Sequence, residues 1–241
     1  MEKLIYAFWR KPADEPAALR RVLIEELKPE LAKLGAERLQ FNIVDFDEQA
    51  KGLVNFQLVC TKPPPDGIIS FWLTSAYRRQ PAEALLAKTF ARIAGYVVAE
   101  STILPNVKHP SKQDERTFGF SQVTFLKLPP RLKFEEWRQI WFGRHTKVGI
   151  ETQANFRYVQ NVVILPLTEG APEYRGIIEE CFPIEAMTDP YVFYDAVGDE
   201  QKFQKNLSTM MESVQRFIDL DKVDVIPTSE YLLHSQAEPK L

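Results

Sequence analysis

Two stretches of the chain repeat each other, and this repeat constrains the fold more than any other feature. Residues 38–44 read RLQFNIV, and residues 157–163 read RYVQNVV. Further matches follow in the same order in both halves, and their shared order indicates a tandem duplication. The aligned pairs are Asn42 with Asn161, Gly67 with Gly176, and Glu100 with Glu230.

Hydrophobic periodicity predicts the same order of elements, β-α-β-β-α-β, in each half of the chain. Runs of β-branched and aromatic residues indicate strands, and apolar residues three and four apart indicate helices. In the first half we expect strands at 3–10, 38–45, 67–74 and 96–103, an extra strand at 53–60, and helices at 17–34 and 81–95. In the second half we expect strands at 118–127, 156–165, 174–182 and 223–233, and helices from 134 and in the later part of 190–218.

This order of elements is that of the ferredoxin-like unit. A single four-stranded sheet with helices on one side leaves its other face bare, and two such sheets can bury those faces against each other. We therefore predict an α+β fold of two tandem ferredoxin-like units. The expected parts are an N-terminal unit with a degenerate repeat at 1–105, a linker at 106–117, a C-terminal unit at 118–234 and a flexible tail at 235–241.

Composition excludes several classes of partner and cofactor. The 30 basic and 33 acidic residues are mixed along the chain without a basic block, so neither nucleic acid nor a membrane is expected as a partner. No run of about 18 apolar residues and no signal peptide is found, and two cysteines fit a reducing cytoplasm. Three scattered histidines predict no metal site, and the ten glycines form no phosphate-binding or dinucleotide motif.

The most function-like stretch is residues 134–165. Its first part has the spacing of an amphipathic helix and places His145 on the same face as Trp137 and Trp141. Its second part is a strand on which Tyr158 and Gln160 share one face, while Asn161 points to the other. If one of these faces lines a barrel, the other must meet the helices.

The second half resembles the EthD family over about residues 120–233. The resemblance is carried by the Trp-then-His helix, the strand RYVQNVV, the strand YRGIIEE, the segment RFID and the closing strand with Glu230. It implies a dimeric α+β barrel, here with both units in one chain, as either a monomeric pseudo-dimer or a homodimer. It also implies that His145 takes the place of the family histidine, with Trp141, Tyr158, Gln160 and Asn161 as its neighbours.

Each candidate residue has a functional reading and a structural one. His145 could move protons, because its ordinary pKa is near neutrality, or it could bond a backbone carbonyl. Trp137 and Trp141 could stack on an aromatic ligand or fill the core, and core is favoured for Trp137. The candidate catalytic residues are His145, Tyr158 and Glu180, and the candidate substrate-binding residues are Trp137, Trp141, Arg144, Gln160 and Asn161.

For Glu180 and Asn161 the sequence leaves a structural role open beside the functional one. Strand alternation sends one of Glu179 and Glu180 inward and the other outward, and an inward carboxylate is either an acid or base or a partner of an arginine such as Arg144 or Arg157. The repeated asparagine at position 42 favours a structural role for Asn161.

Three hypotheses from different classes follow. The first is a small-molecule enzyme of the lyase, isomerase, decarboxylase or cofactor-free oxygenase type, without a tightly bound organic cofactor, that acts on an aromatic or polyketide-like compound. In it His145 transfers the proton, and Tyr158 and Gln160 hold the resulting oxyanion. The second is a non-catalytic protein that binds a small apolar or aromatic ligand in a degradation pathway. The third is a haem protein that uses the helix histidine.

Overall fold

The computed structural model describes residues 1–12, 15–45, 58–112 and 114–233. Its strands are β1 (Glu2–Trp9), β2 (Glu37–Ile43), β3 (Gly67–Leu73), β4 (Arg92–Leu104), β5 (Phe120–Leu126), β6 (Arg157–Pro166), β7 (Gly176–Phe182) and β8 (Asp224–Leu232). The longer helical segments are α1 (Pro16–Arg21), η1 (Val22–Leu27), α2 (Lys28–Lys33), α3 (Gln80–Thr89), α4 (Phe134–Ile140), η4 (Trp141–His145), α5 (Thr146–Thr152) and α7 (Glu200–Gln215). Short helical turns are η3 (Ala76–Arg78), η5 (Ile184–Met187), α6 (Pro190–Phe193) and η6 (Leu220–Lys222).

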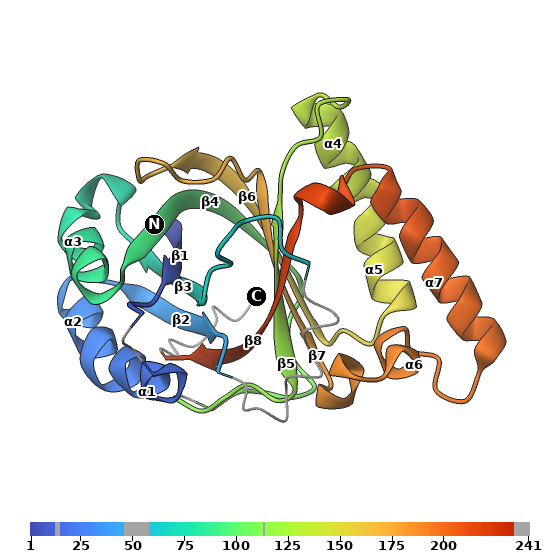
Figure 1. Ribbon diagram of the computed structural model, residues 1–241, viewed down its shortest axis with the longest axis horizontal. Coiled ribbons are helices and arrows are strands. Elements are labelled where there is room, and N and C mark those ends of the chain that lie inside the picture. Colours follow the sequence, from blue (N-terminus) through green and yellow to red (C-terminus); the bar gives the residue numbers. More distant parts are fainter. Residues whose placement is uncertain (13–14, 46–57, 113, 234–241) are drawn as a thin grey trace.

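The strands form one closed antiparallel barrel in the order β1-β3-β2-β8-β5-β7-β6-β4. Each half contributes four neighbouring strands, and the pairs β2–β8 and β4–β6 join the halves. The helices of the two halves lie on opposite sides of the barrel (Figure 1). The predicted fold, two tandem ferredoxin-like units that form a dimeric α+β barrel within one chain, is confirmed.

The buried apolar residues form three main clusters and a smaller one around Phe120, Phe182 and Phe193. The barrel interior holds an apolar cluster to which both halves contribute, including Ile5, Tyr96 and Phe125. A second cluster lies between the first half's sheet and its helices, and a third lies between the second half's sheet and α4, η4 and the segment after α7. Each sheet is therefore covered on both faces, by helices on one and by the other sheet on the other, as expected for two ferredoxin-like units that pack together.

The two seams between the halves carry the same pair of residues. Glu100 of β4 lies opposite Asn161 of β6, and Glu230 of β8 lies opposite Asn42 of β2. All four side chains point into the barrel. The repeat seen in the sequence therefore coincides with the approximate twofold relation between the halves.

Two predicted elements differ from the structure or lie outside it. The helix predicted at 81–95 ends at Thr89, because residues from Arg92 onward pair with β1 instead. Tertiary pairing overrides the local helical pattern there. The extra strand at 53–60 falls mostly outside the described residues, although Leu58 forms a bridge to Val225. The tail at 235–241 also lies outside them. Among the helices that are described, none is long and apolar enough to span a bilayer.

Candidate functional site

Except for Asn161 and Arg144, the predicted site residues lie between the second half's sheet and its helices, outside the barrel. The helix from Phe134 to Thr152 runs over β6 and β7, and a π-helical segment at Trp141–His145 occupies its middle. Both indoles are fully buried and pack on Gly176 of β7. A Cβ added there would lie 2.7 Å from the Trp141 ring, so only glycine allows the helix to approach this closely.

A hydrogen-bonded polar cluster lies beneath this helix. Gln160 donates through Nε2 to Thr146 Oγ1 at 2.8 Å and to Tyr158 Oη at 2.9 Å. Trp141 Nε1 donates to the same Tyr158 oxygen at 3.4 Å. The Gln160 side chain is completely buried, yet its carbonyl oxygen has no hydrogen-bond partner among the residues that the structure describes. An unpaired buried acceptor is costly, so this oxygen is a candidate for contact with a ligand donor.

His145 belongs to the same layer but bonds in another direction. Its Nδ1 lies 2.9 Å from Ser213 Oγ of α7, and its ring packs against Phe217. Burial disfavours the charged imidazolium and lowers the pKa of His145 to about 4, so the imidazole is neutral at pH 7. No hydrogen bond joins it to Tyr158 or Glu180 in the part of the chain that the structure describes.

The neighbouring carboxylates Glu179 and Glu180 face opposite sides of β7. Glu180 lies directly across from Tyr158 on the helix side, and Asn155 Nδ2 donates to it at 3.1 Å. Burial raises the pKa of Glu180 to about 7, although the Asn155 bond acts in the opposite direction. Glu180 is therefore close to half-ionised at neutral pH, which suits proton transfer.

Glu179 points into the barrel, where two cations surround it. Lys3 Nζ lies 2.8 Å from one of its oxygens, and Arg157 Nη2 lies 3.6 Å from the other. Burial alone would raise the pKa of Glu179, but Lys3 and Arg157 outweigh burial and lower it to about 2. Asn161 also donates to Glu179, at 2.9 Å, so both residues belong to a structural network of the barrel.

The remaining predicted residues are spread over different environments. Trp137 donates through Nε1 to the carbonyl of Phe217 at 3.1 Å and fills the core. Arg144 is exposed on the helix and points away from the cluster. Thr146, Asn155 and Ser213 were not predicted. Thr146 could have been found as the neighbour of His145, but the Ser213 contact spans 68 residues and leaves no local signal.

A cleft of about 520 Å³ opens beside the polar cluster, over the seam between β4 and β6. We call it the β4–β6 cleft. It is lined by Ala99, Ser101, Leu128, Phe134, Arg138, Phe142, Val162, Val163, Ile164 and Arg175. Ser101 pairs directly with Gln160, and antiparallel partners project to the same side of a sheet. The apolar cleft thus ends next to the polar cluster.

The residues around His145 do not fit a haem. His145 does not line the cleft, its Nδ1 is engaged by Ser213, and Phe217 covers its ring. The layer between helix and sheet is filled by Trp137 and Trp141, which contact Gly176. Nor does any group of three or more His, Cys, Asp or Glu residues with metal-binding geometry occur among the described residues.

Comparison with known proteins supports the fold. No family model matches the sequence, and no curated protein matches it. An anthrone oxidase-like protein matches all of this chain and 96% of its own, with a TM-score of 0.55 and 8% identity. A dye-decolorizing peroxidase from Bacteroides thetaiotaomicron (TM-score 0.48, 9% identity) covers 95% of this chain and 93% of its own. A mutant chlorite dismutase from Candidatus Nitrospira defluvii (TM-score 0.47, 11% identity) covers 96% and 91%. At 8% identity the likeness to the anthrone oxidase-like protein is one of fold alone.

Proposed function

We propose that the chain is an EthD-like small-molecule enzyme that acts, without a tightly bound organic cofactor, on an aromatic or polyketide-like compound. One observation carries the proposal: the apolar β4–β6 cleft adjoins a buried polar cluster in which the Gln160 carbonyl accepts no hydrogen bond from any described residue. A volume of about 520 Å³ lies in the range of small-molecule sites. The fold shared with an anthrone oxidase-like protein is consistent with a flat aromatic ketone as the substrate class.

The proposed chemistry is removal of a proton from a carbon next to a carbonyl or phenol. The carbon–hydrogen bond breaks, its electrons move to the substrate oxygen, and the neutral imidazole of His145 accepts the proton. Tyr158 holds the oxygen that becomes negative. Two N–H groups already donate to the Tyr158 oxygen, which leaves its own hydrogen for the substrate. Glu180 is the second proton-transfer group, and elimination, isomerisation or decarboxylation then completes the reaction.

The test is deuterium exchange at C10 of anthrone and of anthrone-2-carboxylate, the methylene carbon whose carbanion is conjugated with the carbonyl through the aromatic rings, followed by NMR in D₂O at pH 7. The wild-type chain should accelerate exchange, and His145→Gln, which keeps a partner for Ser213, should reduce the acceleration about 100-fold. Exposed Glu212 on α7 supplies the control Glu212→Gln, which should exchange as the wild type does. Equal rates for wild type and His145→Gln would exclude His145 as the proton acceptor.

A binding protein without turnover is the second candidate, and one observation favours it. None of the three candidate catalytic residues, His145, Tyr158 or Glu180, lines the β4–β6 cleft. A ligand could therefore be held there without meeting a proton-transfer group. This function predicts ligand uptake with no exchange above the buffer rate, and unchanged affinity in Glu180→Gln.

A further inference from the structure

The β4–β6 cleft has a positive charge bias among its lining residues. Arg138 and Arg175 both line it, and no carboxylate does. Arg138 lies 3.8 Å from Glu135 and over the Phe142 ring, so its charge is partly engaged. Arg175 makes no side-chain hydrogen bond or ion pair with any residue that the structure describes. A cation at the edge of an apolar cleft, without an acidic partner, suits a ligand that brings its own negative charge.

The rest of the lining is suited to a flat apolar body. Phe134 and Phe142 come from the helix, while Val162 and Ile164 project from β6. On β4 the corresponding positions are the small residues Ala99 and Ser101, which leave the room that the cleft occupies. Aromatic side chains prefer flat apolar partners, and a few polar groups at one end then fix the orientation of the ligand.

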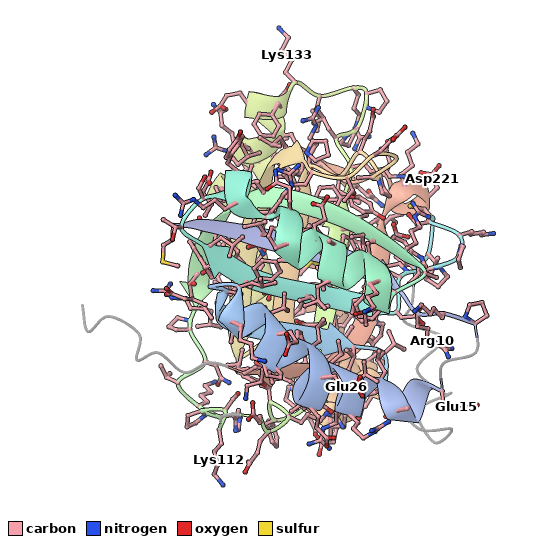
Figure 2. The ribbon with its side chains drawn as sticks, turned by 90° about the vertical axis from the view of Figure 1, so that its left-hand side faces the viewer. Arg10, Glu15, Glu26, Lys112, Lys133 and Asp221 are labelled. Carbon is pink, nitrogen blue, oxygen red and sulfur yellow. The ribbon has the colours of Figure 1, made fainter. Side chains whose placement is uncertain are left out.

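A second groove shows that this charge bias is not general for the fold. The groove of about 600 Å³ over the first half lies between its first helix and α3. Its charged lining residues are Lys11, Arg21 and Lys88 against Glu15, Glu26 and Glu30. Figure 2 shows Glu15 at the start of the first helix and Glu26 further along it. Three bases against three acids give that groove no preference for an anion.

We propose that the β4–β6 cleft binds an aromatic anion, with the apolar rings over Ala99 and Val162 and the anionic group on Arg175, supported by Arg138. A carboxylate or sulfonate can accept two parallel N–H bonds from a guanidinium. The inference narrows the substrate class of the proposed function and rests on it for the reaction. The binding itself does not depend on His145 or Glu180.

The test compares two fluorescent probes that differ by one charge. Anilinonaphthalene sulfonate and N-phenyl-1-naphthylamine share their rings, and only the first carries a sulfonate. The full chain should bind the anionic probe more tightly, and Arg175→Gln should weaken that probe about tenfold while it leaves the neutral probe unchanged. Arg21→Gln removes the same charge from the other groove and should change neither affinity. Ala99→Trp fills the base of the cleft and should weaken both probes.

The outcomes decide whether the probes bind in the β4–β6 cleft and whether the cleft prefers the anionic probe. Equal affinity for the two probes, or equal losses in Arg175→Gln and Arg21→Gln, would overturn the anion preference. Unchanged binding in Ala99→Trp would place the probes elsewhere and overturn the site. If the anion preference holds but neither ketone exchanges deuterium, the proposed catalysis fails and the inference stands. If exchange occurs equally on anthrone and its carboxylate, the catalysis stands and the inference fails.

Discussion

The two halves share their topology, yet they fill the space between helices and sheet differently. The alignment of Asn42 with Asn161 and of Gly67 with Gly176 places three residues of the first half at the positions of the polar cluster. Leu39, Phe41 and Phe71 correspond to Tyr158, Gln160 and Glu180, respectively. All three are fully buried in the first half's apolar cluster. The same backbone therefore supports an ordinary core on one side of the barrel and buried polar groups on the other.

The first helices of the two halves correspond in the same way. Leu19, Leu23, Leu27 and Leu31 repeat every four residues and are buried in the first half. Trp137, Trp141, His145 and Gly149 occupy the matching positions. Both helices contain a π-helical segment at the same place, Val22–Leu27 and Trp141–His145. Such segments often mark functional sites. In this chain the first half has the same π-helical segment beside an all-leucine core, so the segment is a feature of the fold. The two halves differ in the side chains that the segment carries.

The largest effect is expected where the halves depend on each other. Glu179→Gln removes the fully buried carboxylate that Lys3 and Arg157 share. Of its carboxylate partners Lys3 then keeps only Glu100 and Arg157 keeps only Glu230, which should cost about 3–5 kcal/mol of folding free energy. Urea unfolding at pH 7 measures it. The adjacent Glu180→Gln, on the other face of β7, has no cation partner and should not be destabilising. A loss of less than about 1 kcal/mol in Glu179→Gln would show that the barrel network does not hold the halves together.

A smaller effect, with a characteristic pH dependence, is expected from Glu180. The pKa of Glu180 is about 7 in the folded chain, against an ordinary value of 4.5. Between pH 4.5 and pH 7 the folded chain therefore keeps a proton on Glu180 that the unfolded chain has lost. Stability therefore falls as pH rises from 4.5 to 7 and stays reduced above, by about 3 kcal/mol. Glu180→Gln should remove this loss, since Gln cannot ionise. Parallel stability curves for wild type and variant from pH 5 to pH 8 would contradict a strained carboxyl at this position.

Much of this arrangement could be predicted from sequence because the signals are local or repeated. The order of elements follows from periodicity, and the tandem duplication follows from the aligned Asn, Gly and Glu residues. The shared layer of Trp141, Tyr158 and Gln160 follows from helix and strand spacing. What alternation could not decide was which face of β6 looks into the barrel. The packing places Tyr158 on the helix side and Asn161 on the barrel side.

Long-range contacts account for what the sequence did not reveal. The cation partners of Glu179 include Lys3, 176 residues away, and only barrel closure brings them together. Arg144 was predicted at the site, with a possible role as partner of an inward carboxylate, but it lies one position before His145, and on a helix that turns its side chain about 100° away. Arg175 lies between strands and carries no motif. It becomes a candidate only once the β4–β6 cleft is formed.

The smallest predicted effect concerns Gly149, which stands where the first half has Leu31. A Cβ at Gly149 would lie 3.9 Å from the Tyr158 ring and 3.8 Å from Gln153, which is ordinary van der Waals contact. Gly149→Ala should therefore stabilise the chain by about 0.5–1 kcal/mol through helix propensity, measured by thermal or urea unfolding. Gly143→Ala, on the exposed side of the same helix with nothing within 4 Å, should gain a similar amount. A gain at Gly143 with a loss at Gly149 would mean that Tyr158 needs the space that glycine leaves. The space that Gly149 leaves beside Tyr158 would then be part of the site. The first half fills the same position with Leu31, so the second half would have lost packing there in favour of function.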